Sequence, residues 1–157
     1  MTATSVSRRR VGSSALPPFV SPNAERSRNM AAIKGRDTRP EILVRHAVHR
    51  AGFRYRLHSS KLTGRPDFVL RRYRVAVFVQ GCFWHGHECR IGHIPRTNTA
   101  YWKAKIQRNI DRDAKNARLL EQEDWTVATI WECSLKKGTT ELLKRLRIRR
   151  SRAARCA

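Results

Sequence analysis

One aspartate lies where a tight turn leads into a short apolar stretch, in the segment Gly64-Arg65-Pro66-Asp67. The turn places the Asp67 carboxylate at the beginning of a strand, and the next apolar run ends about ten residues later. An acid on one strand and polar groups on the next could hold Mg2+, which polarises a scissile phosphate and lowers the pKa of an attacking water. An aspartate after a turn is also a common cap, so this pattern alone leaves both interpretations open.

Three further side chains could act beside that carboxylate. His85 carries an imidazole, which titrates near neutral pH and can take a proton from water or give one to a leaving oxygen. Asp113 could orient this ring from a long helix, although a lone aspartate on a helix is more often a solvated surface residue. Glu41 has a structural role as the partner of Thr38 in a capping box, and contact with a metal-bound water is its second candidate role.

Three cysteines and a histidine have a spacing that favours a metal site. The pattern is Cys82-x4-His87-x-Cys89, followed by Cys133 after a strand. Three thiolates and one imidazole make a closed tetrahedral zinc site of the structural type, which would fasten a long loop to the last strand. The alternative is that the cysteines are small buried hydrophobic residues and that the histidine is a surface residue. A fourth cysteine, Cys156, lies in an arginine-rich tail and is expected to be a free thiol.

Large aromatic residues are unusual in a loop that is otherwise rich in Gly, His and Cys. Phe83 and Trp84 lie in this loop, and Trp102 follows at the start of the next helix. They could be ordinary core residues. They could also form an aromatic wedge (Phe83, Trp84 and Trp102) that enters a DNA base step and unstacks it.

The spacing of apolar residues predicts the elements that must position these side chains. Steps of three and four residues predict helices, and short alternating or continuous apolar runs predict strands. The expected helices cover residues 21–35, 38–52 and 100–123, with a last one from a cap at Thr139 or Thr140 through Leu146; the expected strands cover 53–57, 68–70, 75–79 and 125–131. This order predicts an α/β layer structure with a mixed central sheet.

The charge of the chain points to a polyanionic partner, most commonly nucleic acid. The 157 residues include 34 Lys and Arg against 12 Asp and Glu, for a net charge of +22. Nine basic residues and one acidic residue lie in 136–157, and three arginines lie in 1–22. We expect a disordered basic extension over 1–20, one folded domain over 21–137, and a basic helix or tail over 138–157. The chain has no apolar run long enough to span a bilayer, and we do not expect its first residues to act as a secretory signal, because no apolar stretch follows the early arginines.

Several ordered motifs resemble the very-short-patch (Vsr) DNA mismatch repair endonucleases of bacteria. They span residues 22–137 and are Arg28-Asn29-Met30, Arg36-Asp37-Thr38, Gly64-Arg65-Pro66-Asp67-Phe68, Gly81-Cys82-Phe83-Trp84-His85-x-His87-x-Cys89 and Trp131-Glu132-Cys133. The resemblance implies a three-layer fold like that of restriction endonucleases, a structural Zn2+ and a catalytic Mg2+. It also implies a nick beside the thymine of a T:G mismatch that leaves a 5′-phosphate, which starts repair of deaminated 5-methylcytosine.

Carried over position by position, the resemblance assigns roles to individual residues. Asp67 and the carbonyl of Val79 become the Mg2+ ligands, His85 the acid/base residue, Asp113 its partner, and Glu41 a residue near the metal. The zinc ligands become Cys82, His87, Cys89 and Cys133, and the DNA-inserting residues become Phe83, Trp84 and Trp102. The helix over 21–35 becomes a minor-groove contact. The resemblance further implies a cytoplasmic protein at the nucleoid that acts as a monomer, with mismatch-repair proteins as candidate partners.

One departure from the family pattern lies at the end of the buried strand. Familiar members have Thr-His where this chain has Val79-Gln80. Valine keeps the backbone carbonyl as a ligand, and glutamine keeps hydrogen bonding but does not titrate, so His85 remains the one obvious acid/base candidate. Two alternatives stay open: an endonuclease without mismatch preference, and a catalytically impaired, zinc-stabilised DNA-binding protein.

Overall fold

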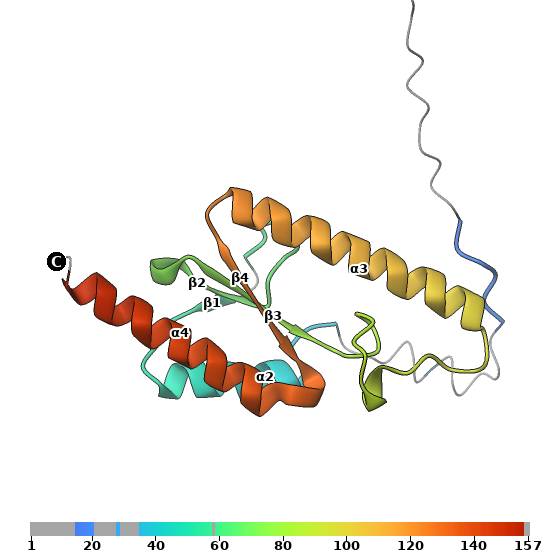
Figure 1. Ribbon diagram of the computed structural model, residues 1–157, viewed down its shortest axis with the longest axis horizontal. Helices are drawn as coiled ribbons and strands as arrows, with labels where there is room; N and C mark the ends of the chain where they lie inside the picture. The colour runs from blue at the N-terminus through green and yellow to red at the C-terminus, as the bar shows by residue number, and fades with distance from the viewer. Residues whose placement is uncertain (1–14, 21–27, 29–34, 58, 156–157) are drawn as a thin grey trace, which may run out of the picture.

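A four-stranded mixed sheet forms the centre of the protein. The computed structural model describes residues 15–20, 28, 35–57 and 59–155 (Figure 1). The strand order is β1-β2-β3-β4, with strands β1 Arg56–Leu57, β2 Phe68–Leu70, β3 Val75–Gln80 and β4 Thr126–Trp131. The β1–β2 and β2–β3 pairs are antiparallel, whereas β3 and β4 run parallel, with Val79 opposite Ile130. The predicted α/β class and mixed sheet are therefore confirmed.

Helices cover both faces of the sheet and give three layers. Helices α2 (Arg39–Arg50) and α4 (Leu135–Arg155) pack on one face, and α3 (Thr99–Gln122) lies across the other (Figure 1). The larger apolar core lies on the α2–α4 face and includes Val48, Phe68, Val77, Ile130 and Leu146. A smaller core centred on Leu120 lies beneath α3. No helix in the described part of the chain is long and apolar enough to cross a membrane.

Within the described residues, the predicted elements from α2 to β4 agree with the structure except for the first strand. Only Arg56–Leu57 pairs as β1, although the alternation suggested a strand over 53–57. Phe53 is instead fully buried in the larger core, with its ring edge-on to Tyr73 and the guanidinium of Arg150 over its face. Packing of this ring takes the place of strand pairing.

The predicted cap of the last helix is wrong. Helix α4 begins at Leu135, because the turn Glu132–Ser134 runs directly into it and no new cap is needed. Thr140 lies inside the helix, where its hydroxyl donates a hydrogen bond to the carbonyl of Lys136. Leu142 and Leu146 of this helix are core residues. The expected domain boundary between residues 137 and 138 therefore divides a helix that belongs to the core.

The chain before α2 is described only in part. The predicted helix over 21–35 lies outside the described residues except for its positions 28 and 35. Residues 15–20, which were expected to belong to a disordered extension, instead contact the start of α3 through Phe19 and Val20.

Candidate active site and metal centre

Polar side chains from four parts of the fold converge on one cavity, which we call the catalytic cavity. Its volume is about 730 Å³, and it opens where β3 ends. The residues around it include Thr38, Glu41, Arg65, Asp67, Val79, Gln80, His85, Arg112, Asp113 and Glu132. The structure thus brings together the four acid/base and carboxylate residues singled out in the sequence.

Asp67 sits at the edge of this cavity and is fixed by the neighbouring strand. Its Oδ2 atom accepts a hydrogen bond of 2.7 Å from the backbone N–H of Val79, and its own N–H donates to the carbonyl of Val77 at 3.0 Å. The antiparallel pairing of β2 and β3 imposes this position, because it places the residue before β2 beside the end of β3. The carboxylate and the backbone of Val79 are oxygen donors of the kind that Mg2+ prefers.

His85 and Asp113 form a close pair. The imidazole Nδ1 lies 2.5 Å from Asp113 Oδ2, and the second carboxylate oxygen accepts a hydrogen bond from Arg112 Nη2 at 3.0 Å. An ionised carboxylate can only accept, so in the neutral form of the ring the proton lies on Nδ1 and Nε2 keeps its lone pair. The pair therefore fixes the tautomer in which Nε2 can receive a proton.

A glycine lets the loop that carries His85 pack tightly on α3. Gly86 has φ +64°, and a Cβ at this position would lie 2.7 Å from Ile110 and 2.8 Å from Ile106. Asn109 of the same helix donates a hydrogen bond to the carbonyl of Trp84. Only glycine adopts this turn without strain or collision. The turn lies between His85, which lines the catalytic cavity, and His87, which belongs to the predicted zinc site.

Glu41 is a buried carboxylate that the start of α2 holds in place. It is 3% exposed and accepts hydrogen bonds from the Thr38 hydroxyl, the Asp37 N–H and the guanidinium of Arg45, which is itself 5% exposed. The sequence reasoning missed Arg45, although a glutamate and an arginine at i and i+4 are a known helix pair. Removing one partner of a buried ion pair costs about 3–5 kcal/mol, so this arginine helps to hold the Glu41 side chain at the cavity wall.

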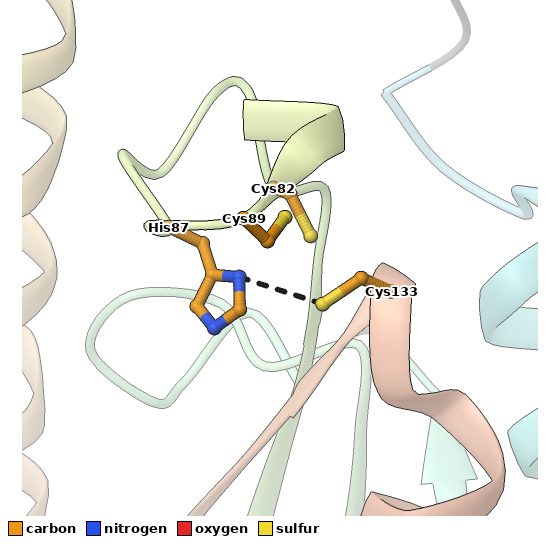
Figure 2. Close-up of side chains that lie close together, drawn as sticks. All are labelled: Cys82, His87, Cys89 and Cys133. Carbon is orange, nitrogen blue, oxygen red and sulfur yellow. Dashed lines mark hydrogen bonds between the residues drawn. The ribbon is translucent and has the colours of Figure 1, made fainter. Parts of the chain in front are cut away.

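The three cysteines and the histidine of the predicted zinc site meet in space (Figure 2). The ligand atoms of Cys82, His87, Cys89 and Cys133 all lie within 4.8 Å of one another, and His87 Nδ1 is 3.4 Å from Cys133 Sγ. Three sulfurs and one nitrogen at this separation suit a tetrahedral ion, and this cysteine cluster could hold a metal such as Zn2+.

The surroundings of the cysteine cluster affect its thiols differently. Burial raises the pKa of the Cys82 thiol to about 12, whereas a hydrogen bond with His87 lowers the pKa of Cys89 to about 6. The indole of Trp131 stacks on the His87 ring, with centroids 4.3 Å apart. No role for this tryptophan was predicted beyond its place in the motif Trp131-Glu132-Cys133; it lies two residues before Cys133 at the end of β4 and orients the imidazole.

The aromatic wedge residues also lie together, next to the catalytic cavity. The ring centroids of Phe83 and Trp84 are 5.0 Å apart, and those of Phe83 and Trp102 are 5.1 Å apart. Lys105 places its ammonium over the rings of Trp84 and Trp102. Trp102 is only 5% exposed, so its ring is covered in this structure.

A carboxylate at a strand end, a histidine–aspartate pair and a strongly basic chain are together typical of nucleases. This is the class of protein that the fold and the site define.

Comparisons with known proteins identify the family. The profile described as DNA mismatch endonuclease Vsr matches residues 20–91. The Type II nicking enzyme V.NmeAIP of Neisseria meningitidis is 46% identical over 113 residues, which cover 72% of this chain and 81% of the relative. V.XorIIP of Xanthomonas oryzae, also named a Type II nicking enzyme, is 45% identical over 68% of this chain and 78% of the relative. The DNA mismatch endonuclease Vsr of Escherichia coli is 41% identical over 72% of each chain. The chain belongs to the Vsr family of DNA endonucleases.

Proposed function

We propose that this endonuclease nicks double-stranded DNA beside the thymine of a T:G mismatch and so starts very-short-patch repair of deaminated 5-methylcytosine. The observation that carries the proposal is that Phe83, Trp84 and His85 are consecutive residues, with the Phe83 ring against Trp84 and with Trp84 and His85 lining the catalytic cavity. Rings that open a mispaired step would bring the adjacent phosphate to the proton-transfer residue. Unstacking costs least at a mismatch, which makes such a wedge selective. The relative from Escherichia coli is named a DNA mismatch endonuclease.

The proposal includes two metal ions and a fold relationship. Asp67 and the Val79 carbonyl would hold Mg2+, with Glu41 near it, and the cysteine cluster would hold a structural Zn2+. The donor sets fit these ions, since oxygen donors suit Mg2+ and thiolates with imidazole suit Zn2+. The three layers around a mixed sheet support a relationship to restriction endonucleases.

The proposed reaction is an in-line hydrolysis. When bound, Mg2+ would polarise the scissile phosphate and acidify the attacking water. Asp113 holds the His85 ring through Nδ1, so Nε2 takes the proton as the water oxygen bonds to phosphorus. The bond from phosphorus to the 3′ oxygen breaks and this oxygen takes up a proton from solvent water, which leaves a 5′-phosphate and a 3′-hydroxyl. Gln80 lies where familiar members have histidine, and its amide can hydrogen-bond to phosphate or water without titrating.

Matched duplexes test the proposal directly. Purified protein with Mg2+ is incubated with duplexes that differ only in a T:G or a T:A pair, and single-strand cleavage is followed on gels. A nick confined to the T:G duplex supports the proposal. Equal cleavage of both would indicate an endonuclease without mismatch preference, and binding without cleavage would indicate a DNA-binding protein.

His85→Ala is expected to lower the nicking rate on T:G DNA by about 10²–10⁴-fold, the usual contribution of a positioned acid/base residue. Binding of the same duplex should change little, because the variant keeps the aromatic wedge and the basic surface. His93→Ala is the matched control, since His93 is exposed and its ring hydrogen-bonds only locally, to the carbonyl of Arg90. A near-normal rate for His85→Ala would remove this residue from the mechanism.

A further inference from the structure

A short N-terminal segment is fastened to the start of α3 across 78 positions of sequence. The side-chain amide of Asn98 donates a hydrogen bond of 2.8 Å to the Val20 carbonyl and accepts one of 3.1 Å from the Val20 N–H. Both bonds join exposed groups. Asn98 makes no capping bond to α3 with its side chain, so its amide is committed to this segment, residues 15–20.

The two hydrogen bonds place Phe19 against the aromatic wedge. The Phe19 ring is edge-on to Trp102 at 5.8 Å between centroids and tilted against Tyr101 at 5.0 Å. Phe83 and Tyr101 contact other sides of the same indole. Phe19 is 37% exposed, whereas Trp102 is 5% exposed. Phe19 is therefore the outer layer and Trp102 the covered one.

We propose that Phe19, held by Asn98, is a specificity-determining residue: it covers Trp102 and must be displaced before this ring can enter a base step. The inference rests on the proposed mismatch function, because it assumes that Trp102 belongs to the aromatic wedge. It adds Phe19, which lies outside the catalytic cavity and the cysteine cluster, and a step in which this ring leaves Trp102 before the wedge enters the DNA.

A cover of this kind selects among duplexes that are already bound. Uncovering Trp102 has the same free-energy cost on every duplex, but base unstacking costs more at a T:A pair than at a T:G pair. A small free-energy cost of uncovering Trp102 can therefore leave the wedge inserted in most T:G complexes but not in most T:A complexes. Without the cover, a larger fraction of T:A complexes would be inserted and nicked, while T:G complexes, already inserted, would change little.

Three single variants separate the cover from its surroundings. Phe19→Ala removes the covering ring. Asn98→Gly removes both hydrogen bonds without straining the backbone, since Asn98 has φ +55° and glycine adopts this region readily. Val20→Ala is the matched control, because the Val20 side chain is 71% exposed and its backbone groups still bond Asn98. Thermal unfolding confirms that each variant folds.

The first measurement uses no DNA. Hydroxyl-radical footprinting with mass spectrometry reports the oxidation rate of each tryptophan. We expect oxidation of Trp102 to rise about three- to tenfold in Phe19→Ala and Asn98→Gly, the range that loss of an aromatic contact or of two exposed hydrogen bonds allows. It should stay unchanged in Val20→Ala, and Trp125, beyond the far end of α3, serves as the internal reference. Unchanged Trp102 oxidation in the first two variants would overturn the cover itself.

The second measurement is the single-turnover nicking rate at saturating protein on T:G and T:A duplexes. We expect the T:A rate to rise about three- to tenfold in the same two variants, while the T:G rate stays within about twofold. An equal rise on both duplexes, or a loss of T:G nicking, would overturn the assignment; the latter would mean that Phe19 itself enters the stack. A wild-type protein that nicks both duplexes equally would overturn the proposed function and the selectivity role together, while the footprint would still decide whether Phe19 covers Trp102.

Discussion

Asp67→Asn is expected to lower the nicking rate by about a thousandfold or more while leaving the fold unchanged. Asparagine keeps an oxygen that can accept the hydrogen bond from the Val79 N–H, so the junction of β2 and β3 is preserved. It removes the negative charge that would hold Mg2+, and a catalytic metal contributes several kcal/mol of transition-state stabilisation. The measurement is single-turnover cleavage of a T:G duplex at saturating Mg2+, together with thermal unfolding.

An aspartate outside the cavity provides the matched control. Asp111 is exposed on α3, and its carboxylate accepts a hydrogen bond from Gln107, which asparagine can also accept. Asp111→Asn changes the net charge by the same amount and should nick at the normal rate. Equal losses in both variants would mean that the overall charge matters rather than the site. A normal rate for Asp67→Asn would exclude this carboxylate as a metal ligand.

The elements that the sequence predicted well are those whose pattern is local. The run at β3 is continuous and β-branched, and the stripe along α3 repeats every three or four residues, so each could be assigned from neighbouring residues alone. The cysteine cluster was predictable for a different reason. Cys82, His87 and Cys89 lie within eight positions, and Cys133 was the one core cysteine left to complete a four-ligand set.

The features that escaped prediction depend on contacts between distant residues. Asn98 and Val20 are 78 positions apart, and no local pattern marks their pairing. The cover over Trp102 depends on the same contact, and the sequence alone left open whether this residue belongs to the core or to a DNA-inserting wedge. The start of α4 was misplaced because Thr139 and Thr140 resemble helix caps, although the helix already includes Gly138. In the fold the lack of a side chain at this glycine makes room for Ile130, which would lie 2.9 Å from an added Cβ.

The basic C-terminal helix combines structural and exposed charges. Arg149 donates hydrogen bonds to the Tyr73 carbonyl and the Thr126 hydroxyl, and Arg150 lies over Phe53. These two arginines fasten α4 to the domain. The exposed Arg145, Arg147 and Arg152 make no such contacts among the described residues and remain available to a polyanion. Only part of the charge near the C-terminus can therefore add phosphate affinity of the kind that counterion release provides.

Loss of the metal from the cysteine cluster should have the largest effect on stability. In the loop over 81–98, Cys82 is the one fully buried residue, so few apolar contacts hold this segment to the sheet. The loop nevertheless carries His85 and the first two wedge residues. A metal bound by the cysteine cluster would join it to Cys133 at the end of β4, and binding energy of this kind contributes directly to folding.

Cys133→Ser is therefore expected to abolish zinc binding, lower the melting temperature by about 10 °C and remove nicking. Cys133 is exposed, so serine disturbs no packing, and the expected shift corresponds to a loss of several kcal/mol in a domain of this size.

Zinc content by mass spectrometry and thermal unfolding with and without a chelator measure the effect. Cys156→Ser is the control, because the sequence predicts a free thiol at this position rather than a zinc ligand. A wild-type protein without zinc, or a Cys133→Ser variant with an unchanged melting temperature, would show that apolar packing and the Asn109 contact suffice to hold the loop. If instead the chelator lowers the melting temperature of the wild type to that of the variant, the metal is what stabilises the fold through this loop, which carries His85.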